Sequence, residues 1–96
     1  MPPATVHVSA SDLELAGTYE ETGDVLYLSA PDDDKKASAQ ETPEGHAVRL
    51  DATGRVTHIS VINAKWLLER DGVLIATLRD GRRLGLARED VASVMG

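Results

Sequence analysis

Two stretches of the sequence decide the fold: TYEETGDVLYL (residues 18–28) and GHAVRLDATGRVTHISVINA (residues 45–64). In both, residues that favour turns separate runs of β-branched, aliphatic and aromatic residues. Gly23 can supply a positive φ in the first turn, and the segment 51–54 fits a type I turn that ends in a left-handed glycine. Each stretch therefore predicts a β-hairpin.

The register of the second hairpin stays open between two alternatives. If Asp51 faces Arg55, then His46, Val48 and Leu50 share a face with Val56, His58 and Ile62. If Leu50 faces Arg55, then Val48 and Leu50 join Ile59 and Val61. Apolar residues of the segment 55–62 fall on both faces, so periodicity does not decide between these registers, and we expect a central strand covered on both sides.

The rest of the chain supplies further short elements. Asn63 is expected to cap a helix that closes with Gly72 in the left-handed position, and Asp80 with Gly81 is expected to form a two-residue type I′ turn. The predicted fold class is α+β: a mostly antiparallel β-sheet of consecutive hairpins with two short helices, in one domain. The expected strands are 5–8, 13–19, 25–29, 37–41, 46–51, 55–62, 73–79 and 82–86, the expected helices are 64–70 and 88–95, and a charged loop is expected over 31–36.

Composition limits the classes of function. With 96 residues, 3% aromatics, no Phe and no Cys, the chain predicts a thin aliphatic core and excludes disulfides, thiolate zinc sites and cysteine nucleophiles. Residues 1–48 hold ten carboxylates and two lysines, whereas residues 49–96 hold six carboxylates and eight Arg or Lys, for a net charge of −6. This acidity argues against nucleic-acid and membrane binding. No apolar run is long enough to span a bilayer, so we expect a cytoplasmic protein.

The order of residues across both hairpins resembles a known family. Tyr19, the run 24–28, Glu44 with Gly45, and the pattern of aliphatic and turn residues over 48–64 are similar to the family catalogued as domain of unknown function 2283. The similarity covers about residues 13–64, and residues 65–96 form an extension. The resemblance implies a small bacterial, mostly antiparallel β domain without established chemistry. It also implies small two-gene loci, some of which resemble toxin–antitoxin pairs.

Four polar residues within this pattern are candidates for contact with a ligand or partner: Tyr19, Asp24, Tyr27 and Glu44. Turn capping by an Asx side chain accounts for Asp24, and strand alternation accounts for Tyr27. No nucleophile, base and orienting group occur in a recognisable arrangement, so no catalytic residue is assigned.

Histidines and arginines give weaker signals. His7, His46 and His58 lack metal-ligand spacing, so neither a metal nor a cofactor is predicted. The two-residue turn predicted at Asp80 places Arg79 opposite Arg82, where like charges destabilise the hairpin. The segment that includes Arg79, Arg82 and Arg83 is therefore a candidate interface or a contact for an anionic partner.

These observations favour a non-catalytic interaction module. A thin core, edge strands and halves of opposite charge predict a homodimer. The alternatives are an antitoxin-like regulator that binds another small protein, and a small-molecule-binding or hydrolytic protein that uses Tyr19, Asp24 and Tyr27.

Overall fold

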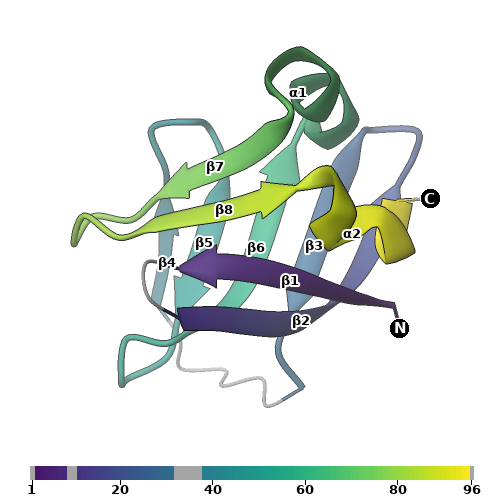
Figure 1. Cartoon of the computed structure of the whole chain (residues 1–96). Coiled ribbons are helices and arrows are strands. Elements are labelled where there is room, and N and C mark those ends of the chain that lie inside the picture. Colours follow the sequence, from purple (N-terminus) through teal and green to yellow (C-terminus); the bar gives the residue numbers. More distant parts are fainter. Residues whose placement is uncertain (1, 9–10, 32–37, 96) are drawn as a thin grey trace.

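Eight strands form one antiparallel sheet that curls into a half-barrel (Figure 1). The computed structural model describes residues 2–8, 11–31 and 38–95. Along the sheet the strand order is β4-β5-β6-β3-β2-β1-β8-β7. The strands are β1 (Pro3–Val8), β2 (Ser11–Glu20), β3 (Val25–Ser29), β4 (Ser38–Glu41), β5 (Ala47–Leu50), β6 (Val56–Ile62), β7 (Val73–Thr77) and β8 (Arg83–Ala87), and the helices are α1 (Ala64–Asp71) and α2 (Arg88–Met95).

The predicted class, mostly antiparallel β with two short helices, is confirmed. Five neighbouring pairs are consecutive along the chain, but β3 pairs with β6 and β1 pairs with β8. The hairpin β4–β5 therefore lies outside β6, and β8 from the C-terminal segment completes the sheet beside β1. The expected loop over 31–36 falls outside the described residues except for Pro31.

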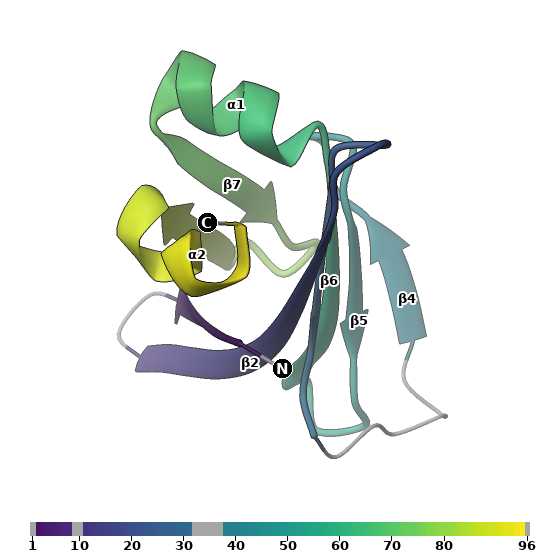
Figure 2. The same ribbon diagram turned by 90° about the vertical axis from the view of Figure 1, so that its right-hand side faces the viewer.

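The core lies on the concave side of the curled sheet. Its buried hydrophobic side chains in the described chain are all aliphatic, as the composition predicts, and they include Leu26, Ile59 and Leu84. Figure 2 shows both helices on one side of strands β4, β5 and β6. The prediction that the strand over 55–62 is covered on both sides is therefore wrong, since Ile62 is 43% exposed on the other side. Helix α2 packs on β1 and β2 where Gly17 lets the backbones approach, because a Cβ there would lie 2.5 Å from Cγ2 of Val94.

A β-bulge resolves the register of the hairpin β5–β6. Near the turn Asp51 donates its N–H to the Arg55 carbonyl and Leu50 pairs with Val56, as in the first predicted register. Beyond the bulge Val48 pairs with Ile59, and neither predicted register contains this pair. The extra residue on β6 is Thr57, which is buried and donates its hydroxyl to the Arg49 carbonyl at 3.3 Å.

The hairpin β7–β8 differs from its prediction by one residue. Leu78 donates its N–H to the Arg82 carbonyl, so the loop spans residues 79–81 with Gly81 at φ 93°. Arg79 and Arg82 therefore do not face each other, and the predicted clash of like charges is wrong. The physical reason is the inner face: this register pairs Leu74 with Leu86 and Ala76 with Leu84, and all four are buried.

Candidate functional site

Tyr19 and Asp24 meet at the start of α1. The Asp24 carboxylate accepts the Tyr19 hydroxyl at 2.7 Å and the backbone N–H groups of Lys65 and Trp66 at 2.7 and 3.2 Å. Burial raises the pKa of Asp24, but these three hydrogen bonds outweigh it and the pKa lies below its ordinary value. The hydrogen bond to Asp24, followed by burial, raises the pKa of Tyr19 to about 12.

Two local predictions are corrected here. Asn63 has a left-handed backbone, with φ 58°, and makes no side-chain cap; Asp24 caps α1 from the β2–β3 turn instead. Gly23 does not have a positive φ, because the left-handed residue of that turn is Asp24 itself, with φ 55°. Asp24 adopts this backbone more readily than most non-glycine residues, and it directs the carboxylate at the helix N-terminus. Gly72 ends the helix in the left-handed conformation, as predicted.

Glu44 joins the β4–β5 turn to β7. Its carboxylate accepts the Thr77 backbone N–H at 2.9 Å and the Thr77 hydroxyl at 2.6 Å. Burial raises the pKa of Glu44, but the bonds from Thr77 dominate and lower the pKa to about 2. Nearby, the Gln40 side-chain oxygen accepts the Arg79 N–H at 2.9 Å. These side chains hold the β7–β8 hairpin against β4 and its turn.

His46 lies beside Glu44 and is almost completely buried. Its Nδ1 accepts the Ile62 N–H at 3.1 Å, so the neutral ring carries its proton on Nε2. Burial lowers the pKa of His46, and the Glu44 charge opposes this only in part. The ring is therefore a neutral donor near pH 7.

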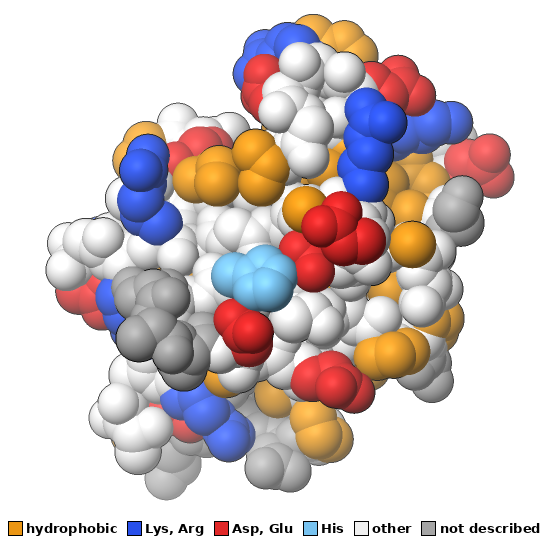
Figure 3. All heavy atoms as spheres, viewed as in Figure 1, with side chains coloured by type: hydrophobic (Ala, Val, Ile, Leu, Met, Phe, Trp, Pro, Cys, Tyr) orange, Lys and Arg blue, Asp and Glu red, His pale blue; other side chains and the backbone are white. Residues whose placement is uncertain are grey.

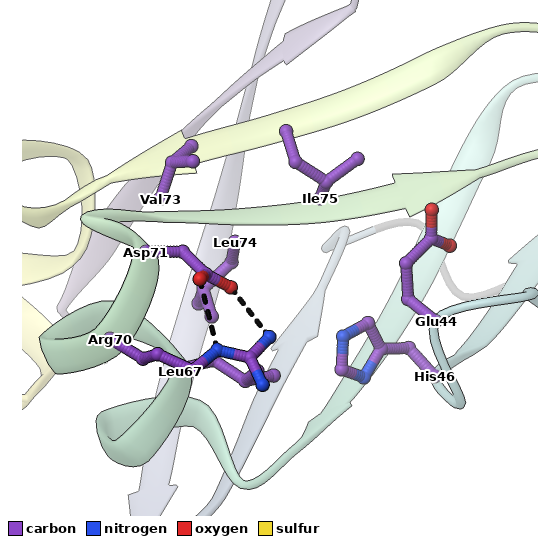
Figure 4. A pocket seen from close by; sticks show the side chains of 8 residues that line it. All are labelled: Glu44, His46, Leu67, Arg70, Asp71, Val73, Leu74 and Ile75. Atoms are coloured by element: carbon purple, nitrogen blue, oxygen red, sulfur yellow. Dashed lines mark hydrogen bonds and ion pairs between the residues drawn. The ribbon is translucent and has the colours of Figure 1, made fainter.

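A pocket of about 350 Å³ lies between α1, the free edge of β7 and the β4–β5 turn (Figure 4), and we name it the seam pocket. Arg70 and Asp71 form a bidentate ion pair at one end, with Nε–Oδ1 at 2.9 Å and Nη2–Oδ2 at 2.8 Å. Arg70 also stacks over Trp66, with 4.6 Å between Cζ and the ring centroid. The lining residues are Glu44, His46, Leu67, Arg70, Asp71, Val73, Leu74 and Ile75.

The Tyr27 side chain points to the convex side of the sheet, opposite the Tyr19 side chain. We use the name outer face for the convex surface of β2, β3, β6 and β5. Tyr27 and Ile62 are the large hydrophobic side chains exposed on it, at 47% and 43%. The same side of the sheet carries Glu20 and Arg49 toward its ends, and its central residues are Thr18, Val25, Tyr27, Ala47, Ser60 and Ile62.

The predicted arginine cluster is divided between roles. Arg82 donates to Asp80 at 2.8 Å and to the Gly54 carbonyl at 2.7 Å, which ties the β7–β8 loop to the β5–β6 turn. Arg79 and Arg83 are exposed, and Arg83 lies on β8 opposite Thr77. The cluster is thus partly structural.

On the face that carries β1, acidic side chains surround a histidine (Figure 3). His7 places Nδ1 2.8 Å from Asp12 and Nε2 3.0 Å from Asp90. The bonds to Asp12 and then Asp90 raise the pKa of His7. Asp90 also accepts the Ala87 N–H at 2.7 Å, so the cluster links β1, β2 and the start of α2. Within the described residues there is no grouping of three or more His, Cys, Asp or Glu suited to a metal.

Sequence reasoning selected Glu44 but missed the pocket beside it. The sequence gives no local signal for a pocket at Arg70, Asp71 and the β7 edge. The pocket forms only where Glu44 contacts Thr77, and these two residues are far apart in the chain. Nothing in the sequence around His46 indicates the hydrogen bond that its ring accepts from Ile62.

Searches with this chain find no matching family model, no matching curated protein and no matching solved structure. The resemblance to the domain of unknown function 2283 family therefore stays a prediction. Across the described ranges, neither helix has the length and apolar character needed to cross a bilayer.

Proposed function

We propose that this protein is a non-catalytic homodimeric interaction module whose copies meet through the outer face. The observation that carries the proposal is a sheet surface that no helix or strand of the described residues covers, and on which Tyr27 and Ile62 are exposed. Both helices lie on the other side of strands β4, β5 and β6, and they leave this surface open (Figure 2). An exposed apolar patch rimmed by polar residues is typical of a protein interface.

Charge supports a second copy as the occupant. The chain carries a net charge of −6, so two copies repel each other over most of their surfaces. The six central residues of the outer face carry no charge, and the charged Glu20, Glu41 and Arg49 lie at its borders. Two acidic copies therefore approach here with less repulsion than over the rest of their surfaces.

The corners of this face are complementary. Glu20 pairs with Val25 at one end of β2, whereas Arg49 lies on β5 at the opposite corner. A twofold axis in the interface, perpendicular to the line between these corners, places Glu20 of one copy over Arg49 of the other. Because the contact is isologous, the pair forms twice.

The reactive residues considered from the sequence support a non-catalytic role. Asp24 and Tyr19 are bonded to each other and to the N-terminus of α1. Glu44 is bonded to Thr77. Tyr27 lies on the opposite side of the sheet from the Tyr19 side chain, since adjacent Leu26 is buried and pairs with Tyr19.

Light scattering at micromolar concentration tests the proposal. The wild-type protein should have the mass of a dimer, and Tyr27→Lys should weaken dimerisation at least tenfold by placing two like charges in an apolar contact. Ala92→Lys makes the same change of charge on α2 and is the matched control, which should remain dimeric. A wild-type protein of monomer mass, or equal weakening by both variants, refutes the proposal.

A further inference from the structure

The edge of β7 is open beside the seam pocket. In the described sheet β7 pairs only with β8. Thr77 directs its N–H away from β8 toward Glu44, and Leu78 directs its N–H to Arg82 on the β8 side. Because alternate residues of an antiparallel strand point their backbone groups the same way, Ile75 and Val73 also face away from β8.

Side chains already take the place of a further strand along part of this edge. Glu44 and Gln40 accept the N–H groups of Thr77 and Arg79, where the carbonyls of an added strand would lie. Next to Val73 and Ile75 the structure has the seam pocket instead. The seam pocket runs along β7 from Val73 to Ile75, so about two or three residues of extended chain, at roughly 3.3 Å per residue, would span it.

The pocket also supplies a fixed donor opposite the edge. His46 projects from the β5 side into the space below β7 (Figure 4). Since Nδ1 accepts the Ile62 N–H, Nε2–H is the donor that remains for a ligand. At the other end Arg70 and Asp71 neutralise each other, and Leu67 and Leu74 contribute apolar lining.

We propose that the seam pocket binds a short, extended, uncharged peptide segment of another protein, which adds a strand to β7 at Val73 and Ile75. The peptide backbone exchanges hydrogen bonds with Ile75, and one peptide carbonyl accepts from Nε2–H of His46. An uncharged segment fits because the Arg70–Asp71 pair is already satisfied and both oxygens of the Glu44 carboxylate already accept hydrogen bonds from Thr77. This site is separate from the outer face, so it is independent of dimerisation. Strand addition of this kind derives affinity from backbone bonds and specificity from the pockets for alternate side chains.

The test is an amide NMR titration of the full chain with the capped peptide acetyl-Thr-Val-Thr-Val-amide. Saturable shifts of the Val73 and Ile75 amides are expected. The same peptide N-methylated at all four residues should bind at least about tenfold more weakly, because its residues then lack backbone N–H donors in either pairing register. Equal binding of the two peptides, or no saturable shift at these amides, overturns the proposal.

Variants of Ile75 provide a matched pair. Ile75→Pro removes the N–H that faces the open edge, a position where proline is tolerated in an edge strand, and should abolish binding. Ile75→Val keeps the N–H and should bind as wild type. A folded Ile75→Pro protein that binds as well as wild type overturns the proposal. If that variant fails to fold, the N-methylated peptide decides alone. Shifts of these amides on dilution, without any response to peptide, would show that a second copy occupies the edge and would also overturn it.

Discussion

The contact between Asp24 and α1 gives the sharpest test of how this fold is held together. Replacing Asp24 with alanine removes three hydrogen bonds, two from backbone N–H groups of α1 and one from the Tyr19 hydroxyl. The N–H groups are exposed and regain water, so loss of this cap costs about 1 kcal/mol. The partly buried bond from Tyr19 to a charged acceptor contributes about 1.5 kcal/mol.

The backbone adds to this cost. Asp24 has φ 55°, and alanine loses about 1 kcal/mol more than aspartate in the left-handed conformation. The free energy of unfolding should therefore fall by about 3.5 kcal/mol in Asp24→Ala. Asp24→Asn keeps the backbone conformation and an acceptor oxygen, so its cost should be about 1 kcal/mol.

Urea unfolding measures these differences. With an m value of about 1.5 kcal/mol/M, the midpoint of Asp24→Ala should lie about 2 M below that of wild type. A double-mutant cycle of Tyr19→Phe with Asp24→Ala should give a coupling energy of about 1.5 kcal/mol, because each variant removes the hydrogen bond between the two side chains. A coupling energy near zero, or a loss below 1 kcal/mol in Asp24→Ala, would refute the reasoning.

The same contact predicts a pH dependence at both ends of the scale. The pKa of Asp24 is lowered in the folded state, so its contribution to the free energy of unfolding is present above pH 3.8. This contribution is lost as the pH falls through the folded pKa. The pKa of Tyr19 is raised from 10.0 to about 12, so its contribution is present below pH 10 and is lost as pH rises toward 12. Tyr19→Phe should remove the alkaline part of this dependence, and unfolding measured from pH 9 to 12 checks it.

Three further predictions concern other contacts. The pKa of His7 in the folded state is raised above 6.5, so its contribution to stability is present below pH 6.5 and is lost as pH rises through the folded pKa. His7→Gln should therefore reduce the urea midpoint at pH 5.5 more than at pH 8.5. Gly17→Ala should cost about 1–3 kcal/mol by overpacking against Val94, and adding Val94→Ala should recover part of this loss in thermal unfolding; full stability of Gly17→Ala would contradict the close packing of α2. The pKa of Glu44 is lowered from 4.5 to about 2, so its contribution is lost as pH falls over that interval, and Glu44→Gln should flatten the acid dependence of stability there; an unchanged acid profile would count against the link to β7.

The turns that depend on neighbouring residues could be predicted from the sequence. Asp51 accepts the N–H groups of Thr53 and Arg55, and Gly54 takes a left-handed φ of 86°, as the local pattern indicates. Gly72 ends α1 for the same reason. These conformations need only the residues of the turn itself.

Features that depend on distant contacts could not be predicted. Asn63 is a good helix cap by residue type, but Asp24 lies close to α1 only after β3 pairs with β6. Likewise, one buried face decides the register of the β7–β8 hairpin, while the turn residues alone are compatible with a shorter loop. The alternation of apolar and polar residues along 55–62 does not indicate the bulge at Thr57, since neighbouring Val56 and Thr57 are both buried.

The position of β1 has a consequence for folding during synthesis. β1 pairs with β2 through local contacts, but its other partner, β8, comes from the far end of the described chain. Until β8 has left the ribosome, the second edge of β1 has exposed backbone groups that can pair with another nascent chain. Contacts between residues so far apart in sequence also slow folding. Emergence of β8 and α2 from the ribosome should therefore be the step at which the chain becomes resistant to aggregation.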